Sequence, residues 1–371
     1  MSTAPLQGRR VAEVLATSTG GVGTHVRSLV APLRAAGASL RVCGPAATDE
    51  LFAFAAGGAA FRPVQISAVP ADPRAVLALA RATTGADLVH AHGLRAALVA
   101  AVARRVAGVH HPLVITLHNA LQPGGGPEQA VLARLEAATI RAADVVLAAS
   151  GDLAENAWRA GARDVRVAPV SAPPLPTAAR DRAAVRAGLG LAADRPLVVA
   201  VGRLHPQKGY RTLLDAAAHW AGQHPAPAVV VAGDGPQQAE LAARIDAERL
   251  PVVLLGRRTD VADLLAAADV CVLPSVWEAR SLTAQEALRS GTPLVATRVG
   301  GIPELVGEAA VLVPAGDPEA LATAVTEVLA DPARAAGLVA AGRARAEQWP
   351  DDAGTARALV ALYRELLGAP A

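Results

Sequence analysis

The sequence predicts an α/β protein with two doubly wound, Rossmann-like domains. Short apolar runs of strand length alternate with helix-like segments along the chain, which is typical of parallel sheets covered by helices. The alternation occurs in two blocks, separated by a proline-rich break at residues 168–176. A chain of 371 residues is long enough for two such domains. We expect domains at residues 1–172 and 173–350, followed by a C-terminal helical segment at 351–371.

The first block alternates between strands and helices in the order that a parallel sheet requires. Its helices are predicted at about 25–36, 75–83, 94–106 and 129–142, the first of them ending at Gly37 because glycine commonly terminates helices. The strands are predicted at 11–16, 40–43, 88–90, 113–116 and 145–148.

The second block repeats this order after a short helix at 178–188. Its strands are predicted at 197–201, 228–232, 252–255, 270–273, 294–296 and 311–313, with helices at 210–221, 237–249, 260–267 and 282–290. Residues 318–349 are mostly helical in pattern, and Pro350 breaks them. The last helix, 351–367, is amphipathic and no strand follows it, so we expect it to cross back onto the first domain.

Composition excludes several classes of function. The net charge is +2 and the basic residues are scattered without interleaved aromatic residues, which disfavours nucleic-acid binding. Cys43 and Cys271 lie far apart in strand-like runs, so we expect buried thiols in a reducing compartment and no metal site. No apolar run reaches the roughly 18 residues of a membrane span. The first apolar run is short and contains Glu13, which argues against a signal peptide. We expect a cytoplasmic protein, with contact to the inner face of the membrane left open.

Glycines and histidines follow the strands of the first block, at the edge where doubly wound sheets bind ligands. Gly20 and Gly21 precede the first helix, where a close backbone approach and the helix N-terminus favour an anion. The loop does not match G-x-G-x-x-G, and no acidic residue follows the second strand, so a dinucleotide is disfavoured. His92 and His118 follow two further strands, and we expect both to face the cleft between the domains.

Lys208 is the only lysine of the chain. It stands with Arg203 in the loop 202–209, directly after an apolar strand. An arginine fork and a lysine point charge in one short loop can hold a diphosphate without a metal. The next strand is followed by Gly233-Asp234-Gly235-Pro236, which predicts a tight turn with Asp234 capping the helix behind it.

Two glutamates follow the strand at 270–273. Glu278 lies in the loop and Glu286 on the second turn of the next helix, among Ala284, Ala287 and Leu288. Because a carboxylate can accept two hydroxyl hydrogen bonds, Glu278 is suited to sugar hydroxyls and Glu286 to a ribose diol. A buried acid needs a partner, so we favour ligand binding for Glu286 over a plain surface role.

Taken together, these motifs resemble the retaining glycosyltransferases of family 4, which have the GT-B fold. The resemblance rests on the Gly20-Gly21 loop, the histidine loops, Gly202-Arg203-Leu204 with Lys208-Gly209, the Gly233–Pro236 turn and Glu278-x7-Glu286. It also includes Ser290-Gly291-Thr292-Pro293 and Gly300-Gly301-Ile302-Pro303-Glu304. It is strong over residues 197–307 and weaker in the first half.

The resemblance implies a UDP- or GDP-sugar donor in the second domain and an acceptor hydroxyl of a lipid, glycan or small molecule in the first. Catalysis would involve His118 and Glu278, with retention of configuration, transfer of a hexose-type sugar and no metal or other cofactor. The donor diphosphate would bind Arg203, Lys208 and Gly21, and the ribose would bind Glu286. The donor sugar would lie near Glu278, Arg280, Ser281 and Leu282. His92 and Gly20 would lie on the acceptor side.

Two departures from the family pattern bear on specificity. The family often has Glu-Gly-Phe where this chain has Glu278-Ala279-Arg280, so an arginine could face the sugar or a charged substituent. It often has Pro-Asn-Gly where this chain has Pro169-Val170-Ser171, so the hinge between the domains can differ.

Two other functions fit the same architecture. A nucleotide-sugar epimerase of the UDP-GlcNAc 2-epimerase type would need acids placed for proton abstraction, and Asp87 and Asp144 flank strands without a clear position in the cleft. A non-catalytic nucleotide-sugar-binding protein is the other alternative, and the presence of all five polar residues His118, Arg203, Lys208, Glu278 and Glu286 argues against it.

Overall fold

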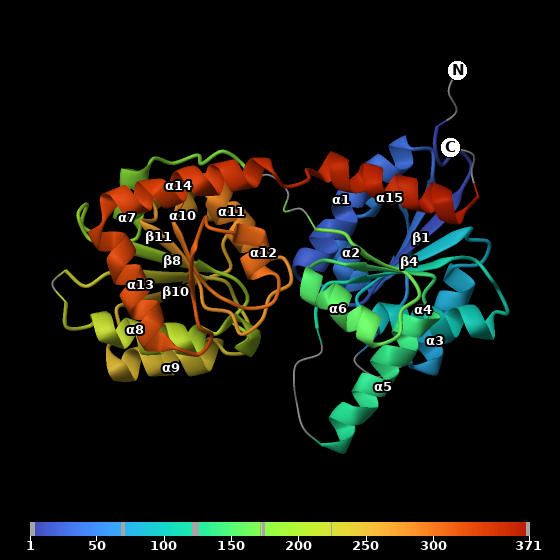
Figure 1. Ribbon diagram of the computed structural model, residues 1–371, viewed down its shortest axis with the longest axis horizontal. Coiled ribbons are helices and arrows are strands. Elements are labelled where there is room, and N and C mark those ends of the chain that lie inside the picture. The colour runs from blue at the N-terminus through green and yellow to red at the C-terminus, as the bar shows by residue number, and fades with distance from the viewer. Residues whose placement is uncertain are drawn as a thin grey trace. The chain divides into compact units, whose positions relative to one another are not determined.

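A computed structural model describes residues 4–67, 71–120, 126–170, 172, 175–223 and 225–368. The chain divides into two compact units (Figure 1): residues 1–173 with 350–371 form unit 1, and residues 174–349 form unit 2. Each unit has one fully parallel sheet with helices on its faces. The predicted fold class, two Rossmann-like α/β domains, is confirmed. Ser171, Pro173 and Pro174 of the predicted proline-rich break lie outside the described residues.

Unit 1 contains a seven-stranded sheet in the order β3-β2-β1-β4-β5-β6-β7. The strand order reverses between β1 and β4, which makes their carboxyl ends the expected ligand edge. The strands are β1 (Arg10–Leu15), β2 (Ser39–Gly44), β3 (Ala60–Pro63), β4 (Leu88–His92), β5 (Leu113–Leu117), β6 (Val145–Ala148) and β7 (Val165–Val167). The helices are α1 (Gly21–Ala35), α2 (Ala46–Phe52), α3 (Pro73–Ala82), α4 (Leu94–Val106), α5 (Pro127–Ala142) and α6 (Gly151–Arg159).

Unit 2 contains a six-stranded sheet in the order β10-β9-β8-β11-β12-β13, which reverses between β8 and β11. Its strands are β8 (Leu197–Val201), β9 (Ala228–Ala232), β10 (Val252–Gly256), β11 (Val270–Leu273), β12 (Leu294–Thr297) and β13 (Val311–Val313). Its helices are α7 (Arg182–Gly188), α8 (Tyr210–Trp220), α9 (Gln238–Glu248), α10 (Val261–Ala267), α11 (Leu282–Ser290), α12 (Ile302–Val306), α13 (Pro318–Ala330) and α14 (Pro332–Glu347).

The cores form on both faces of the sheets, because a parallel sheet covered by helices buries both sides of each strand. Many strands are accordingly mainly apolar, and β5, β9 and β11 are buried throughout. With few aromatic residues available, Trp220 and Tyr363 are the largest fully buried side chains among the described residues.

The last helix, α15 (Asp352–Leu366), belongs to unit 1, where it packs beside α1 (Figure 1). Asp351 caps it by accepting a hydrogen bond from the Gly354 N–H at 2.6 Å. Its buried face contributes Leu359, Leu362 and Tyr363 to the same core as β1. The chain thus returns to unit 1 after completing unit 2.

Local predictions failed at sheet edges and at helix starts. The predicted strands omit β3 and β7, two short edge strands whose residues are largely exposed and lack a buried apolar run. Helix α1 begins at Gly21 rather than near His25. The predicted cap of α9 is wrong: Gln237 is its N-cap residue without a side-chain bond, and Asp234 instead accepts from the Leu204 N–H through its backbone oxygen at 2.7 Å.

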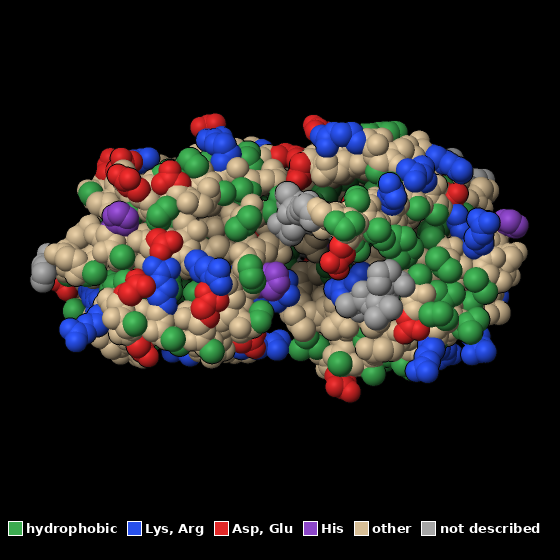
Figure 2. Space-filling view, turned by 90° about the horizontal axis from the view of Figure 1, so that it is seen from below, with side chains coloured by type: hydrophobic (Ala, Val, Ile, Leu, Met, Phe, Trp, Pro, Cys, Tyr) green, Lys and Arg blue, Asp and Glu red, His purple; other side chains and the backbone are tan. Residues whose placement is uncertain are grey.

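Acidic and basic side chains are interspersed over much of the face shown in Figure 2. Many arginines are paired, as Arg166 is with Glu365 at 2.7 Å and Arg244 with Glu248 at 2.7 Å. This mixing agrees with the small net charge. Among the described helices, none combines the length and the apolar composition that crossing a membrane requires.

Candidate active site

In unit 2, the loops that follow β8 and β11 bring the predicted lysine and glutamate into contact. Lys208 Nζ lies 2.5 Å from Glu278 Oε1, and the Ser275 hydroxyl donates to the same oxygen at 2.8 Å. The two charged side chains are 18% and 9% exposed, so they are largely withdrawn from water without being sealed from it. These loops follow the two strands between which the order reverses, the position where α/β sheets bind ligands.

Close backbone packing fixes the distance between these two loops. Gly209, with a φ of +68°, sits where a Cβ atom would come within 1.9 Å of the Pro274 carbonyl oxygen. Both the left-handed conformation and the lack of space require glycine. The Val276 N–H donates to the Gln207 carbonyl at 2.8 Å, and Gln207 Nε2 donates to the Trp277 carbonyl at 2.9 Å. These contacts therefore hold the loop that carries Lys208 at a fixed distance from the loop that carries Glu278.

Helix α11 starts beside this ion pair. Ser281 is its N-cap, and the hydroxyl accepts from the Ala284 N–H at 3.2 Å. Thr283 donates to the Val201 carbonyl at 3.2 Å, which ties the first turn of α11 to the end of β8. Leu282, its first residue, is half-buried. The helix N-terminus thus lies at the same edge as Lys208 and favours an anion there.

Glu286 lies on the second turn of α11, half-buried, and no hydrogen-bond donor among the described residues reaches its carboxylate. Burial raises the pKa of this carboxyl, and the nearby Arg289 opposes the shift. A partly buried acid without a protein donor is costly unless a ligand supplies hydroxyl groups.

The two arginines assigned to the donor behave differently. Arg203 is exposed in the loop after β8, and among the described residues no carboxylate lies within ion-pair distance of it. Arg280 turns its guanidinium onto the Trp349 ring, 5.7 Å from the ring centre. Burial lowers the pKa of Arg280 to about 10, with Glu304 acting in the opposite direction. The Arg280 side chain therefore packs against an aromatic ring, and its place beside the sugar stays a prediction.

In unit 1, the predicted histidines meet at the carboxyl edge of the sheet. His92 is the last residue of β4, and His118 follows β5; their ring nitrogens Nδ1 and Nε2 lie 3.3 Å apart. His92 is 2% exposed, whereas His118 is half-buried and reaches the surface. His25, from α1, packs its ring edge against both at about 5.5 Å between centres.

The glycine loop after β1 forms the start of α1. Gly20 is the N-cap residue and Gly21 the first helical residue, which is exposed. The Ser18 hydroxyl accepts from the Gly23 N–H at 3.0 Å. Gly23 is the sterically required member, because a Cβ there would overlap the Phe52 ring at 2.1 Å. A Cβ at Gly20 would meet no atom within 4 Å, and the ligand-binding roles of Gly20 and Gly21 stay predictions.

The structure adds polar residues that the motifs did not single out. Glu13, in the middle of β1, is fully buried and accepts from His92 Nε2 at 2.7 Å. His90 lies beside Glu13 in the pairing of β1 with β4, and Tyr363 of α15 donates to Glu13 at 2.9 Å. The sequence signal that could have identified Glu13 is an acidic residue within a strand-like apolar run, because a buried acid requires a hydrogen-bond partner.

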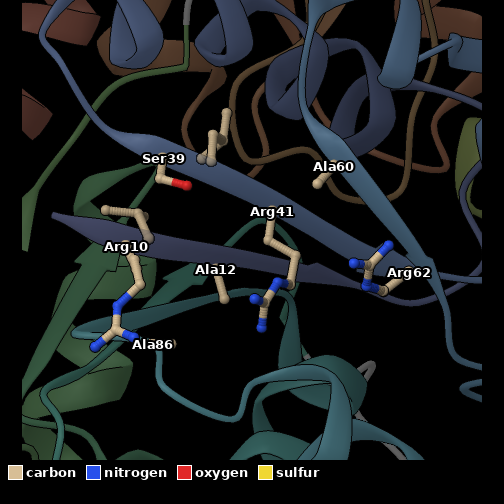
Figure 3. A pocket seen from close by; sticks show the side chains of 9 residues that line it. Arg10, Ala12, Ser39, Arg41, Ala60, Arg62 and Ala86 are labelled. Atoms are coloured by element: carbon tan, nitrogen blue, oxygen red, sulfur yellow. The ribbon is translucent and has the colours of Figure 1, made fainter. Parts of the chain in front are cut away.

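A cavity of about 60 Å³ near the beginnings of β1, β2 and β3 is a poor candidate for this site (Figure 3). Arg10, Arg41 and Arg62 line it. Arg10 is paired with Asp87 at 3.0 Å, and Arg41 donates to the Thr84 carbonyl at 3.2 Å. The cavity is too small for a sugar nucleotide and lies toward the amino ends of the strands, away from the histidines.

Comparisons with known proteins cover both units. Residues 20–173 match the glycosyl transferase 4-like domain, and residues 195–331 match the glycosyl transferases group 1 family. The alpha-maltose-1-phosphate synthase of Mycobacterium tuberculosis is 30% identical over 392 residues, which cover 94% of this chain and 96% of that protein. The D-inositol 3-phosphate glycosyltransferase of Xylanimonas cellulosilytica is 32% identical over 67% of this chain and 65% of its own length, just under two thirds.

Solved structures agree in fold. HepE of Anabaena, solved in complex with UDP-glucose, superposes with a TM-score of 0.83 at 24% identity, over 96% of this chain and 99% of that one. The sucrose-phosphate synthase of Thermosynechococcus elongatus gives a TM-score of 0.79 at 25% identity, over 98% and 100% of the two chains. The family matches and the nearly full-length relatives lead to one conclusion: this chain belongs to the group 1, family 4 glycosyltransferases, with the GT-B fold.

Proposed function

We propose that this glycosyltransferase moves a hexose-type sugar from a UDP- or GDP-sugar to an acceptor hydroxyl, with retention of configuration and without a metal. The observation that carries the proposal is the Lys208–Glu278 pair at the carboxyl edge of the unit 2 sheet, beside the N-terminus of α11. The UDP-glucose bound to HepE supports a nucleotide-sugar donor.

The ion pair is suited to exchange partners when a donor binds. A diphosphate carries more charge than one carboxylate, so it competes with Glu278 for the Lys208 ammonium. Glu278 is then released to accept hydrogen bonds from sugar hydroxyls, with Ser275 still in place to orient it. Arg203 supplies a second cation and α11 its N-terminal N–H groups, so charge developing on the leaving diphosphate is stabilised by the protein itself. This is why we propose that no metal is required.

Glu286 is the residue that we assign to the ribose. Its half-buried carboxylate has no protein donor among the described residues, and two vicinal hydroxyl groups would supply two hydrogen bonds. His118 is the unit 1 residue that we assign to the donor sugar. For retention, we propose front-face attack, in which the leaving diphosphate helps to remove the proton from the acceptor hydroxyl.

The acceptor is a lipid, a glycan or a small molecule with a free hydroxyl group. We propose a cytoplasmic location, at or away from the inner face of the membrane. The free and buried state of Cys43 and Cys271 supports a reducing compartment.

The test is a panel of UDP- and GDP-hexoses incubated with the protein in EDTA, with release of UDP or GDP as the readout. We expect at least one donor to be hydrolysed slowly, and NMR of a transfer product made with an acceptor alcohol, whose glycosidic bond cannot mutarotate, to show the donor's anomeric configuration. Lys208→Ala and Glu286→Ala should each lower turnover or affinity by about tenfold or more, as for a lost charge-assisted contact of ~1.5–3 kcal/mol.

Matched controls come from an exposed ion pair of the same unit. Arg211 and Glu240 pair at the surface, so Arg211→Ala and Glu240→Ala remove the same charges away from the site. Full activity in the Lys208 and Glu286 variants would contradict the assignment of these residues. An altered sugar on an intact nucleotide would show epimerisation instead, and tight binding with neither reaction would show a binding protein.

A further inference from the structure

A buried carboxylate lies at the centre of unit 1. Glu13 is fully enclosed on β1, opposite His90 in the pairing with β4. One carboxylate oxygen faces His92 Nε2 at 2.7 Å, and the other accepts from the Tyr363 hydroxyl at 2.9 Å. An enclosed carboxylate needs such donors, because its hydration has been lost. Both partners come from far away in the sequence, one on β4 and one on the C-terminal helix.

The hydrogen bonds fix the proton positions along one branch of this network. An ionised carboxylate can only accept, so the ring hydrogen of His92 must be on Nε2, which faces Glu13. His92 Nδ1 is then an acceptor. His118 Nε2 faces that nitrogen at 3.3 Å, so it must carry a hydrogen and donate. In a neutral His118 ring, Nδ1 therefore has a free lone pair.

The hydrogens can be placed in the same way along the second branch of the network, which runs from Glu13 through Tyr363 to His90. Tyr363 has one hydroxyl hydrogen and gives it to Glu13, so its oxygen accepts from His90 Nδ1 at 2.6 Å. His90 Nε2 then accepts from the Thr116 hydroxyl, also at 2.6 Å. With Glu13 ionised and the rings neutral, one arrangement of hydrogens satisfies every bond in the cluster. Burial lowers the pKa of His90 and His118 well below the ordinary value, which agrees with neutral rings.

We propose that Glu13 is a positioning residue for His118: through His92 it fixes the Nε2–H tautomer of His118 and leaves Nδ1 as an acceptor for a substrate hydroxyl. His118 is half-buried at the end of β5, so it is the member of the chain that reaches the surface. No protein hydrogen-bond partner among the described residues occupies its Nδ1. The inference rests on the proposed function, in which His118 acts on the donor sugar.

A metal is the competing explanation for the same cluster. Glu13, His90 and His92 offer three ligand atoms that all lie within 4.8 Å of one another. The ring nitrogens of this set, however, already face protein groups at hydrogen-bond distance, and those bonds use every hydrogen consistently. We therefore assign the cluster to hydrogen bonding, and the experiment includes a metal measurement.

The first arm of the experiment reads the tautomers directly in the unmodified full-length protein. Histidine labelled with ¹⁵N gives two-bond ¹H–¹⁵N correlations that distinguish Nδ1–H, Nε2–H and imidazolium forms. Signals are assigned by replacing His92, His118 and His90 with glutamine one at a time. We expect Nε2–H for His92 and His118 and Nδ1–H for His90. An Nδ1–H or charged His118, or one zinc bound per chain by elemental analysis, overturns the proposal.

The second arm is a double-mutant cycle on donor turnover. Glu13→Gln keeps the shape of the side chain but removes its charge, and we expect kcat to fall about tenfold with a smaller change in KM. In a His118→Ala background the same replacement should have no further effect, because Glu13 acts through that ring. Equal losses in both backgrounds would mean that Glu13 only supports the fold.

The two arms separate the inference from the function on which it rests. Normal turnover of His118→Ala removes His118 from the proposed reaction, whatever its tautomer. Turnover that depends on His118 together with the wrong tautomer leaves the proposed function standing and refutes the role of Glu13.

Discussion

Lowering the pH from 7 to 5 is expected to destabilise unit 1 through its enclosed histidines. Burial lowers the pKa of His25 to about 3, and the neighbouring His92 acts in the same direction. An unfolded histidine titrates near 6.5. Between these two values the unfolded chain binds more protons than the folded chain. The free energy of unfolding therefore falls as the pH falls through this window. Above about pH 6.5 the histidine is neutral in both states, so this loss of stability is absent.

The size of the effect follows from the distance between the two pKa values. A pH of 5 is about 1.5 units below the pKa of the unfolded histidine, so that side chain is protonated, while folded His25 remains neutral. Each unit corresponds to about 1.4 kcal/mol, so His25 alone costs about 2 kcal/mol of stability. The lowered pKa values of His90 and His118 add to the loss in the same direction.

The assay is urea unfolding followed by circular dichroism at pH 7 and pH 5, for the parent and for His25→Leu. The variant lacks one titrating group, so its acid-induced loss should be smaller by about 2 kcal/mol. His219→Leu, which removes an exposed histidine of unit 2, should keep the full loss. If the parent and His25→Leu lose the same stability on acidification, His25 is not held neutral by burial and the reasoning is wrong.

Three further predictions concern unit 2. Lys208→Arg should weaken binding of the nucleotide whose sugar the donor panel identifies, UDP or GDP, about tenfold in calorimetry, because a planar guanidinium does not replace the point charge that now contacts Glu278 at 2.5 Å; unchanged affinity would refute this. Gly209→Ala should lower both thermal stability and donor binding, since its Cβ would overlap the Pro274 carbonyl; a variant with parental melting and binding would contradict the required close approach. Trp349→Ala should destabilise unit 2 by roughly 3 kcal/mol in urea unfolding, as for other large core truncations, and a loss below about 1 kcal/mol would show that the ring is not packed as described.

The architecture could be predicted from sequence because its signal is local. Most central strands are short, mainly apolar runs, and a helix-like segment follows each of them before the next strand. The edge strands β3 and β7 lacked that signal, because their side chains are mostly exposed and only pairing with a neighbour makes them strands. Helix α1 began earlier than predicted, since glycines at its start have poor helix propensity, and here a local hydrogen bond from the Gly23 N–H to the Ser18 hydroxyl holds the first turn.

Parts of the candidate site could be predicted for the same reason, and others could not. Lys208 and Glu278 stand in loops whose motifs are continuous in sequence, and the structure joins them. Glu13 meets His92 only through the register of two strands, and meets Tyr363 only because a helix near the end of the chain packs on the first strand. The direction of Arg280, onto Trp349 rather than into solvent, depends on packing that no local pattern encodes.

Unit 1 contains segments from both sides of unit 2 in the sequence, and this affects the order in which the two units can fold during synthesis. Ribosomes release the chain from its N-terminus, and domains generally fold as they emerge. Unit 1 lacks Tyr363 and the rest of α15 until residues beyond unit 2 are synthesised, whereas unit 2 is complete once Trp349 has emerged. The sheet of unit 1 is therefore synthesised first but stays incomplete, because Glu13 lacks the Tyr363 hydroxyl donor until after all residues of unit 2 have been synthesised. The order in which the two units can be finished is the reverse of the order in which they begin.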